Sequence, residues 1–395
     1  MPSPRPLGDA HNFGRRVALR GRFVSKPRPV LWEWLLLSAQ SPLRLLLSGA
    51  ASAGGLGANA FDFLPSLAFE RPRSRAGGAV EHVELAPLGR LSARMKDELA
   101  RTAGRLVALS SWLGIADLHW ENLVLGKDRR GQLVFSPLDI EMILDDLALP
   151  SETKLLPDAD PEYAAMNRHA AGLRRVLPYL GKPLRGEHLL ELAGAYRRTL
   201  ELLDAHGPAI ADVFARLPRF RETPIRVCLR GTDEYVRAQA VPPWPPLLAA
   251  ESEQLARGDV PYFFRRYGDP GIHWYRNRAL TDVGVLPRRG DVPKLAPLLA
   301  VARGLRAPSR KRLREQGLFT LLAAFDHPGL RGRYGNDALT VTFGGRSLRI
   351  RLATGEELDA PRDLSAFVAS IYAPCRCGEV RTVFVPPVTR CRGEL

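Results

Sequence analysis

The amino-acid sequence predicts an α+β protein with a small β-containing amino-terminal lobe, a mainly helical second lobe and a small α/β carboxy-terminal appendage. Three observations support this prediction: a strand-turn-strand pattern at residues 15–26, a helical period over residues 92–114, and alternating strands towards the carboxyl end. With 395 residues, 45% of them apolar, the chain can bury the cores of two or three domains. We expect lobes at residues 1–90 and 91–330, followed by a small β-rich region at 331–395.

The amino-terminal lobe begins with a predicted hairpin at residues 15–26. Val17 and Leu19 alternate with polar neighbours, Arg20-Gly21 supplies a turn, and Lys26 lies at the end of the second strand. The same lobe is expected to contain a helical run rich in leucine and tryptophan at 30–47, a glycine-rich loop at 51–57 and a strand at 80–86.

The second lobe is organised around one long amphipathic helix. Apolar residues such as Met95, Leu99 and Leu106 recur every three or four positions, and the period ends at Gly114. Further helices are predicted at 161–180, 186–205, 208–216, 247–257 and 309–325, and strands at 133–135 and 224–230. In the appendage we predict strands at 339–343, 348–352 and 380–385 and a helix at 362–372.

Composition excludes several classes of protein. The net charge of +15 comes almost wholly from arginine, which GC-rich genomes favour, and no compact basic block is interleaved with aromatic residues. We therefore expect no nucleic-acid partner.

The amino end lacks the apolar segment of a signal peptide, and the most apolar run, at 30–47, is interrupted by Glu33, Gln40, Pro42 and Arg44. We expect a cytoplasmic protein without stable membrane insertion.

The cysteines do not form a disulfide framework. Cys375, Cys377 and Cys391 are crowded near the carboxyl end without a nearby histidine. Three thiolates can ligate zinc, but free cytosolic thiols are the favoured interpretation.

The polar residues after the long helix have the composition of a phosphoryl-transfer site. The helix leads into Asp117-Leu118-His119-Trp120-Glu121-Asn122, and a short strand leads into Asp139-Ile140-Glu141. Phosphoryl transfer needs a group that deprotonates an acceptor hydroxyl and oxygen ligands for Mg²⁺, and this order of elements is typical of the C-lobe of kinase-like folds. In an extended loop, residues two apart can face one cleft. We therefore expect Asp117 and His119 to orient and deprotonate the acceptor hydroxyl. Asn122 and Asp139 are expected to hold Mg²⁺, and Glu141 to support the metal or the loop.

Two further regions supply cations. Lys26 matches the lysine that a kinase N-lobe strand directs towards phosphates, and residues 8–14 are expected to form a loop over the nucleotide. Arg226 and Arg230 share strand parity and can bind a phosphate with planar forks. From these residues alone, there are simpler alternatives: residues 8–14 form a solvated loop, Lys26 is a surface lysine, and Arg226 and Arg230 are solvated on their strand.

Five islands of sequence, in this order, resemble the dehydratase domain of class II (LanM-type) lanthipeptide synthetases. Gly8-Asp9-Ala10-His11 with Gly14 resembles G-D-x-H-x-x-G, Val24-Ser25-Lys26-Pro27-Arg28 resembles V-Y-K-P-R, and the residues from Asp117 to Glu141 resemble D-x-H-x-E-N followed by D-x-E. Arg226, Arg230, Thr232 and Tyr235 fall on R-x-x-x-R-P-T-x-x-Y, and Arg257-Gly258-Asp259-Val260-Pro261-Tyr262-Phe263 resembles G-D-I-P-Y-F. The match extends from residue 8 to about residue 290.

The resemblance implies a lipid-kinase-like bilobal fold that uses ATP and Mg²⁺ to phosphorylate Ser and Thr of a ribosomally made precursor peptide. It then eliminates phosphate, which gives dehydroalanine and dehydrobutyrine. By carry-over, phosphorylation is assigned to Lys26, Asp117, His119, Asn122, Asp139 and Glu141, with support from Asp9 and His11, and elimination to Arg226 and Thr232.

The sequence also departs from the family. Gly231 replaces the proline of R-P-T, which loosens the turn before Thr232. The family's long region before its first motif is absent here, and no cyclase domain with zinc-binding Cys and His residues follows. We therefore do not expect this chain to form rings by itself; a separate cyclase would be a partner.

Two other functions use parts of the same pattern. A small-molecule phosphotransferase of the aminoglycoside-kinase type also has D-L-H-x-x-N followed by D-x-E, but it needs neither Arg226, Thr232 nor the island at 257–263. A degenerate peptide-binding partner of a separate synthetase would not need the full set of polar residues. The dehydratase is the function that the sequence favours.

Overall fold

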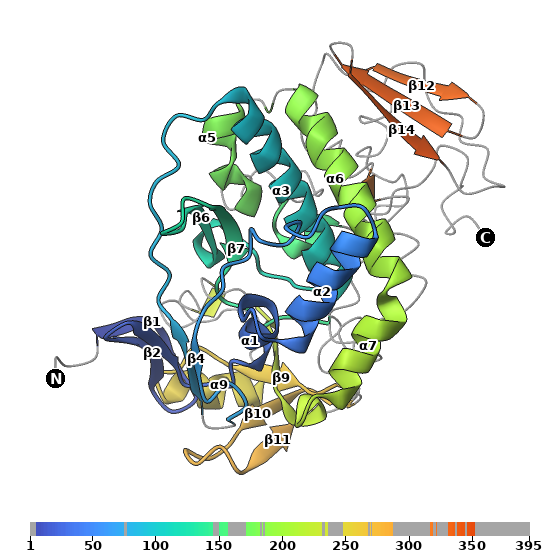
Figure 1. Cartoon of the computed structure of the whole chain (residues 1–395). Helices are drawn as coiled ribbons and strands as arrows, with labels where there is room; N and C mark the ends of the chain where they lie inside the picture. Colours follow the sequence, from blue (N-terminus) through green and yellow to red (C-terminus); the bar gives the residue numbers. More distant parts are fainter. Residues whose placement is uncertain are drawn as a thin grey trace, which may run out of the picture.

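The fold is α+β, as predicted, and every described pair of neighbouring strands is antiparallel (Figure 1). The computed structural model describes residues 5–74, 77–144, 150–156, 171–181, 184, 186–230, 234–235, 248–267, 269, 271–286, 317–318, 321, 331–335, 338–343 and 346–351. Predictions outside these residues are the helix at 362–372, the strand at 380–385, most of the helix at 309–325, Thr232, and the cysteines at 375, 377 and 391.

The first sheet has the strand order β1-β2-β3-β5-β4. The predicted hairpin is confirmed, because β2 pairs with β3 around a turn at Gly21 (φ 59°). The expected loop at residues 8–14 is wrong in part: Gly8 to His11 lie in β1, with a bulge, and the turn is confined to residues 12–14. The strands are β1 (Arg5–His11), β2 (Arg15–Arg20), β3 (Phe23–Lys26), β4 (Phe69–Glu70) and β5 (Gly78–Glu81).

Two helices occupy the predicted helical run at 30–47. α1 (Leu31–Leu37) ends before Pro42, which lacks the N–H that a continuing helix would need. α2 (Pro42–Ala53) starts there, and the Ser41 side chain accepts a hydrogen bond from the Arg44 N–H as its N-cap. Since α2 continues to Ala53, the expected loop at 51–57 starts later than predicted.

The main helical part of the fold is built on α3 (Ala93–Leu113) and α6 (Gly186–Ala205), which run side by side (Figure 1). Both helices lie where the apolar period predicted them. The close approach depends on Gly104, where an added Cβ would lie 2.1 Å from the Leu192 carbonyl oxygen. The main core packs around this pair and includes Leu99, Leu106 and Tyr196.

The remaining elements are a hairpin, a second sheet and several short helices. The hairpin of β6 (Leu123–Lys127) and β7 (Leu133–Pro137) follows the polar loop, and β8 to β11 form a second sheet in the order β11-β10-β9-β8. The described part of the predicted helix at 161–180 is a 3₁₀ turn and a short helix rather than one continuous helix. These and other elements are η1 (Trp120–Asn122), η2 (Pro150–Thr153), η3 (Gly172–Arg175), α5 (Leu177–Leu180), α7 (Gly207–Arg216), η4 (Phe220–Glu222), β8 (Ile225–Val227), α9 (Ala249–Ala256), β9 (Phe263–Arg265), β10 (His273–Tyr275) and β11 (Val283–Val285).

The carboxy-terminal region contains β12 (Arg331–Gly335), β13 (Ala338–Phe343) and β14 (Arg346–Arg351), which form a meander against α6 (Figure 1). Two of these strands were predicted, and β12 was not. Within the described residues, each helix is too short or too polar to span a lipid bilayer.

Candidate active site

The D-x-H-x-x-N loop and the D-x-E segment lie side by side. Gly114 adopts a left-handed conformation (φ 62°) and ends α3, so the chain turns into the loop. The Leu138 N–H donates to the Asn122 carbonyl at 3.0 Å, and the Ala116 N–H donates to the Met142 carbonyl at 3.1 Å. These backbone bonds fix the two motifs against each other, as a shared site requires.

The loop itself is not extended at Asp117. This residue has φ 62°, so the expectation of an extended loop is wrong there. The Asn122 side-chain amide donates to the Asp117 carbonyl oxygen at 2.8 Å, which stabilises the bend, and Lys154 Nζ lies 2.9 Å from Asp117 Oδ1. His119 is extended (φ −70°, ψ 169°), and its Nδ1 lies 3.9 Å from Glu121 Oε2.

Lys26 connects the first sheet to the D-x-E segment. It ends β3, is buried, and places Nζ 2.6 Å from Asp139 Oδ1 and 3.0 Å from Glu33 Oε1. The same ammonium group donates to the Leu138 carbonyl oxygen at 3.1 Å. The lysine therefore bridges a carboxylate of α1 and a carboxylate that follows β7.

Arg28 extends this network. Its Nη2 pairs with Asp139 Oδ1 and lies 2.5 Å from Glu33 Oε1, while its Nε lies 3.0 Å from Glu141 Oε1. On the far side of Glu141, Arg226 Nη1 lies 3.6 Å from Oε2, and the Arg226 N–H donates to the Glu141 carbonyl oxygen at 2.9 Å. We call Lys26, Arg28, Glu33, Asp139, Glu141 and Arg226 the ion-pair cluster.

The charges of the cluster are strongly coupled. Burial opposes ionisation of Asp139, but Lys26 and Arg28 outweigh it and hold the pKa of this carboxyl well below its usual range. Burial likewise opposes the charge on Arg28 and Arg226, yet Glu141 and the neighbouring acids raise the pKa of both guanidinium groups. Asp139, Arg28 and Arg226 therefore stay ionised at neutral pH.

A second contact holds the amino-terminal island over the site. The buried Asp259 carboxylate accepts hydrogen bonds from the N–H groups of Phe13 and Gly14, both at 2.7 Å. The Val260 N–H donates to the Ala10 carbonyl oxygen at 2.8 Å, and His11 Nδ1 lies 2.8 Å from the Val260 carbonyl oxygen. The first and fifth islands of the sequence thus contact each other directly.

Near His11, aromatic packing continues to the ion-pair cluster. The ring of Tyr262 lies edge-on to the His11 ring, with centroids 5.9 Å apart, and the Arg226 guanidinium lies 5.7 Å from the Tyr262 centroid. Burial and the nearby Arg226 charge lower the pKa of His11, so this imidazole is neutral at pH 7. Asp9 is exposed on β1 and acts on His11 through its charge.

Arg226 and Arg230 pair with different acids. Arg226 pairs with Glu141 in the ion-pair cluster, whereas Arg230 Nε lies 2.9 Å from Glu251 Oε1 of α9, which also accepts from the Tyr235 hydroxyl at 2.9 Å. The phosphate fork from both arginines stays a prediction, and Thr232 lies outside the described residues.

The oxygen donors fit a magnesium ion bound with a nucleotide. Asn122 bonds through its amide nitrogen, which leaves the side-chain oxygen as the metal-ligating atom, and Lys26 and Arg28 both bond to Oδ1 of Asp139. Mg²⁺ characteristically takes one or two protein oxygens and completes its octahedron with phosphate and water. Within the described residues, no group of three or more His, Cys, Asp and Glu side chains is arranged to hold a metal by itself.

Three members of this site were not predicted as site residues from the sequence. Glu33 is fully buried in an otherwise apolar helix, and a lone carboxylate in such a run indicates a buried cationic partner. Arg28 was quoted within the V-Y-K-P-R island without a role. Asp259 was quoted within the G-D-I-P-Y-F island without a role, because its two backbone donors lie about 245 residues away in the chain.

Comparison with known proteins gives no assignment: no family model matches the chain, and no curated protein matches it.

Proposed function

We propose that this protein is a LanM-like dehydratase with a lipid-kinase-like bilobal fold. It phosphorylates Ser and Thr side chains of a ribosomally made precursor peptide with ATP and eliminates phosphate to give dehydroalanine and dehydrobutyrine. The observation that carries the proposal is the continuous ion-pair cluster. In it Lys26, assigned to phosphorylation, and Arg226, assigned to elimination, are joined through Asp139, Arg28 and Glu141.

The phosphorylation half is supported by the partners of Lys26. In protein kinases, a strand lysine pairs with a helix glutamate and lies near a metal-binding aspartate. Lys26 on β3, Glu33 on α1 and Asp139 after β7 have these relations. Asn122 and Asp139 would hold Mg²⁺ with ATP, which supplies the phosphoryl group and neutralises its charge.

The acceptor step is assigned to the loop after α3. The substrate hydroxyl oxygen forms a bond to the γ-phosphorus, the bond to the bridging oxygen breaks with release of ADP, and the hydroxyl proton moves to the Asp117 carboxylate. Lys154 lies 2.9 Å from Asp117 Oδ1 and holds the carboxylate in place. His119 lies in the same loop and orients the acceptor.

The elimination half is assigned to Arg226 and Thr232. The Cα proton passes to water, the electron pair of the Cα–H bond forms the Cα=Cβ bond, and the Cβ–O bond breaks so that phosphate leaves with its electron pair. A guanidinium fork beside the leaving oxygens stabilises the charge that develops on them. Because Arg226 shares Glu141 with Arg28, the phosphopeptide need not leave the site between the two steps.

One incubation tests the proposal. The protein is mixed with ATP, Mg²⁺ and the Ser/Thr-rich peptide encoded beside its gene, and the peptide is weighed by mass spectrometry. Loss of water supports the dehydratase. A stable gain of phosphate contradicts the second step and leaves a peptide kinase. An unchanged peptide contradicts both steps, and consumption of ATP with an aminoglycoside instead would support the small-molecule phosphotransferase.

A further inference from the structure

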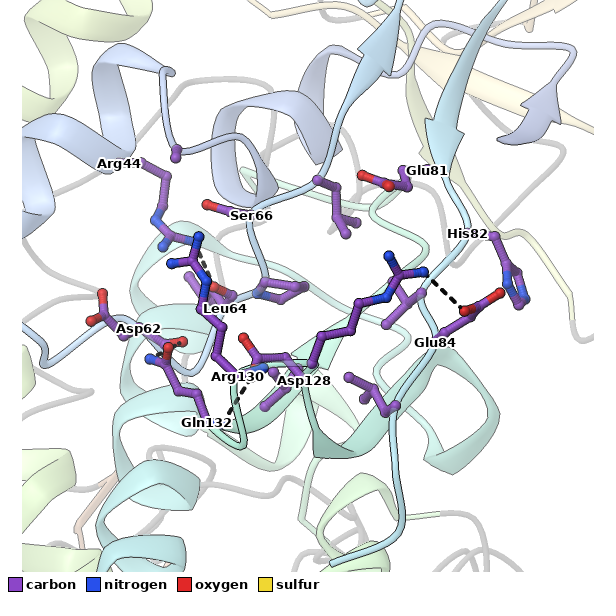
Figure 2. Close-up of a pocket in the computed structure, with 17 residues that line it drawn as sticks. Arg44, Asp62, Leu64, Ser66, Glu81, His82, Glu84, Asp128, Arg130 and Gln132 are labelled. Atoms are coloured by element: carbon purple, nitrogen blue, oxygen red, sulfur yellow. Dashed lines mark hydrogen bonds and ion pairs between the residues drawn. The ribbon is translucent and has the colours of Figure 1, made fainter. Parts of the chain in front are cut away.

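A cavity lies away from the ion-pair cluster. It has a volume of about 590 Å³ and is enclosed by the start of α2, the segment between α2 and β4, the chain after β5 and the β6–β7 turn. None of the six members of the ion-pair cluster lines it. Figure 2 shows that its lining is dominated by charged and polar side chains.

Arg44 is the buried cation of this cavity. Its side chain is only 6% exposed, and Nη1 donates to the carbonyl oxygens of Leu36 at 3.0 Å and Leu64 at 3.1 Å. The buried Nε has no hydrogen-bond partner in the described part of the chain. Neutral carbonyls fix the guanidinium in place but do not neutralise it, and a buried charge without a counterion is costly.

Three of the four carboxylates that line the cavity have other partners in its lining or in the adjoining backbone. Glu84 pairs with Arg129 at 3.2 Å, and Glu81 accepts from the Ala68 N–H at 3.0 Å. Asp128 Oδ1 accepts from the backbone N–H groups of residues 130 and 132, at 2.9 and 2.8 Å, and so holds the β6–β7 turn. Asp62 remains, and its charge partly offsets the burial that lowers the pKa of Arg44.

Arg130 brings a second guanidinium to the same place. Figure 2 shows its side chain extending from the β6–β7 turn towards the end of Arg44, with the Ser66 hydroxyl on the same side. No ion pair of Arg130 occurs in the described part of the chain. Two planar cationic forks and a hydroxyl directed into one cavity match the geometry of a phosphate or carboxylate group.

We propose that this cavity is a binding site for an oxyanion, the phosphate or carboxylate group of a small molecule, held between Arg44 and Arg130 with the hydroxyl of Ser66 as a further donor. Its volume lies in the range of small-molecule sites, so the ligand is larger than the anion alone. The site is separate from the proposed nucleotide site and does not depend on the proposed function.

The test uses isothermal titration calorimetry on the full chain at constant ionic strength, with inorganic phosphate and citrate as separate probes. Arg130→Ala is the test variant, since Arg130 lies on a surface turn and its loss should not prevent folding. Arg216→Ala is the matched control, because Arg216 is 79% exposed, paired with Asp212 on α7 and not part of the cavity lining. Removing a charge-assisted hydrogen bond should weaken binding about tenfold or more in Arg130→Ala, whereas Arg216→Ala should weaken it less than about twofold.

A third variant separates this cavity from the proposed nucleotide site. Lys26→Met should leave binding of the better probe within about twofold of the parent chain. Tighter binding of phosphate identifies a phosphorylated ligand, and tighter binding of citrate identifies a polycarboxylate. The proposal is overturned if neither probe binds the parent, if Arg216→Ala and Arg130→Ala weaken binding equally, or if Lys26→Met removes the binding that Arg130→Ala retains.

Discussion

Arg226 Nη1 lies 3.6 Å from Oε2 of Glu141, a separation that makes an ion pair without a hydrogen bond. Oε2 of Glu141 is buried and has no hydrogen-bond partner among the described residues, while Oε1 is held by Arg28. The Arg226 guanidinium is therefore held by the charge of Glu141, but it makes fewer close contacts with carboxylate oxygens than the Arg28 guanidinium does. This is the state expected of a guanidinium that must also bind a leaving phosphate.

Glu33→Gln tests the unpredicted carboxylate of the ion-pair cluster. The change removes the charge that Lys26 and Arg28 share, which leaves two buried cations with one acid fewer. We expect a loss of about 3 to 5 kcal/mol in the free energy of unfolding. Urea titration measures it.

Glu201→Gln is the control for this change, because Glu201 pairs with Arg197 on an exposed face of α6. It should cost no more than about 0.5 kcal/mol. Equal losses in the two variants would contradict a buried network centred on Glu33.

The acid dependence of stability tests Asp139. Because its folded pKa is depressed, the stability that it contributes is present above the unfolded value of about 3.9 and is lost as pH falls towards the folded value. The stability difference between the parent and Asp139→Asn should therefore be constant from pH 7 to 5 and should narrow below about pH 4. A difference that stays constant down to pH 2 would contradict ion pairing of Asp139 with Lys26 and Arg28.

Asp259→Asn tests the contact between the first and fifth islands. The amide would replace a carboxylate that accepts from Phe13 and Gly14, so the turn at 12–14 should open more often. We expect faster hydrogen exchange at those amides and a higher KM for ATP. Asp212→Asn, which removes an exposed pair with Arg216 on α7, should change neither measurement.

Gly104→Ala tests the packing of α3 against α6. The added Cβ would meet the Leu192 carbonyl oxygen at 2.1 Å, and the resulting shift should cost about 1 to 3 kcal/mol of the free energy of unfolding. Gly49→Ala in α2 meets nothing within 4 Å and should stabilise by about 0.5 to 1 kcal/mol. Thermal unfolding of the pair distinguishes a steric requirement from the general helix preference for alanine.

The spacing of apolar residues and the positions of turn residues predicted those helices and hairpins that interactions between near neighbours in the chain determine. The apolar period of α3 and its stop at Gly114, the hairpin around Gly21 and the helix at 186–205 all follow from spacing and turn residues. The same order of elements predicted that Asp139 would lie beside the loop containing Asn122. Pro42, read as part of one helical run, in fact divides it.

Long-range contacts were not predictable in this way. The pairing of Lys26 with Asp139 joins residues 113 positions apart, and the hydrogen bond from the Gly14 N–H to Asp259 joins residues 245 positions apart. Arg230 lies beyond the end of β8 at Val227, so the strand parity that related it to Arg226 does not apply. These relations depend on tertiary packing, which a single sequence does not encode in its periodicity.

The central claim is that one site carries out both phosphorylation and elimination, and Arg226→Ala tests it most directly. The variant is incubated with ATP, Mg²⁺ and the precursor peptide beside Asp117→Ala and the parent chain, and peptide masses are followed over time. We predict that the parent removes water, that Arg226→Ala accumulates phosphopeptide, and that Asp117→Ala leaves the peptide unmodified. Dehydration by Arg226→Ala at the rate of the parent would contradict the account.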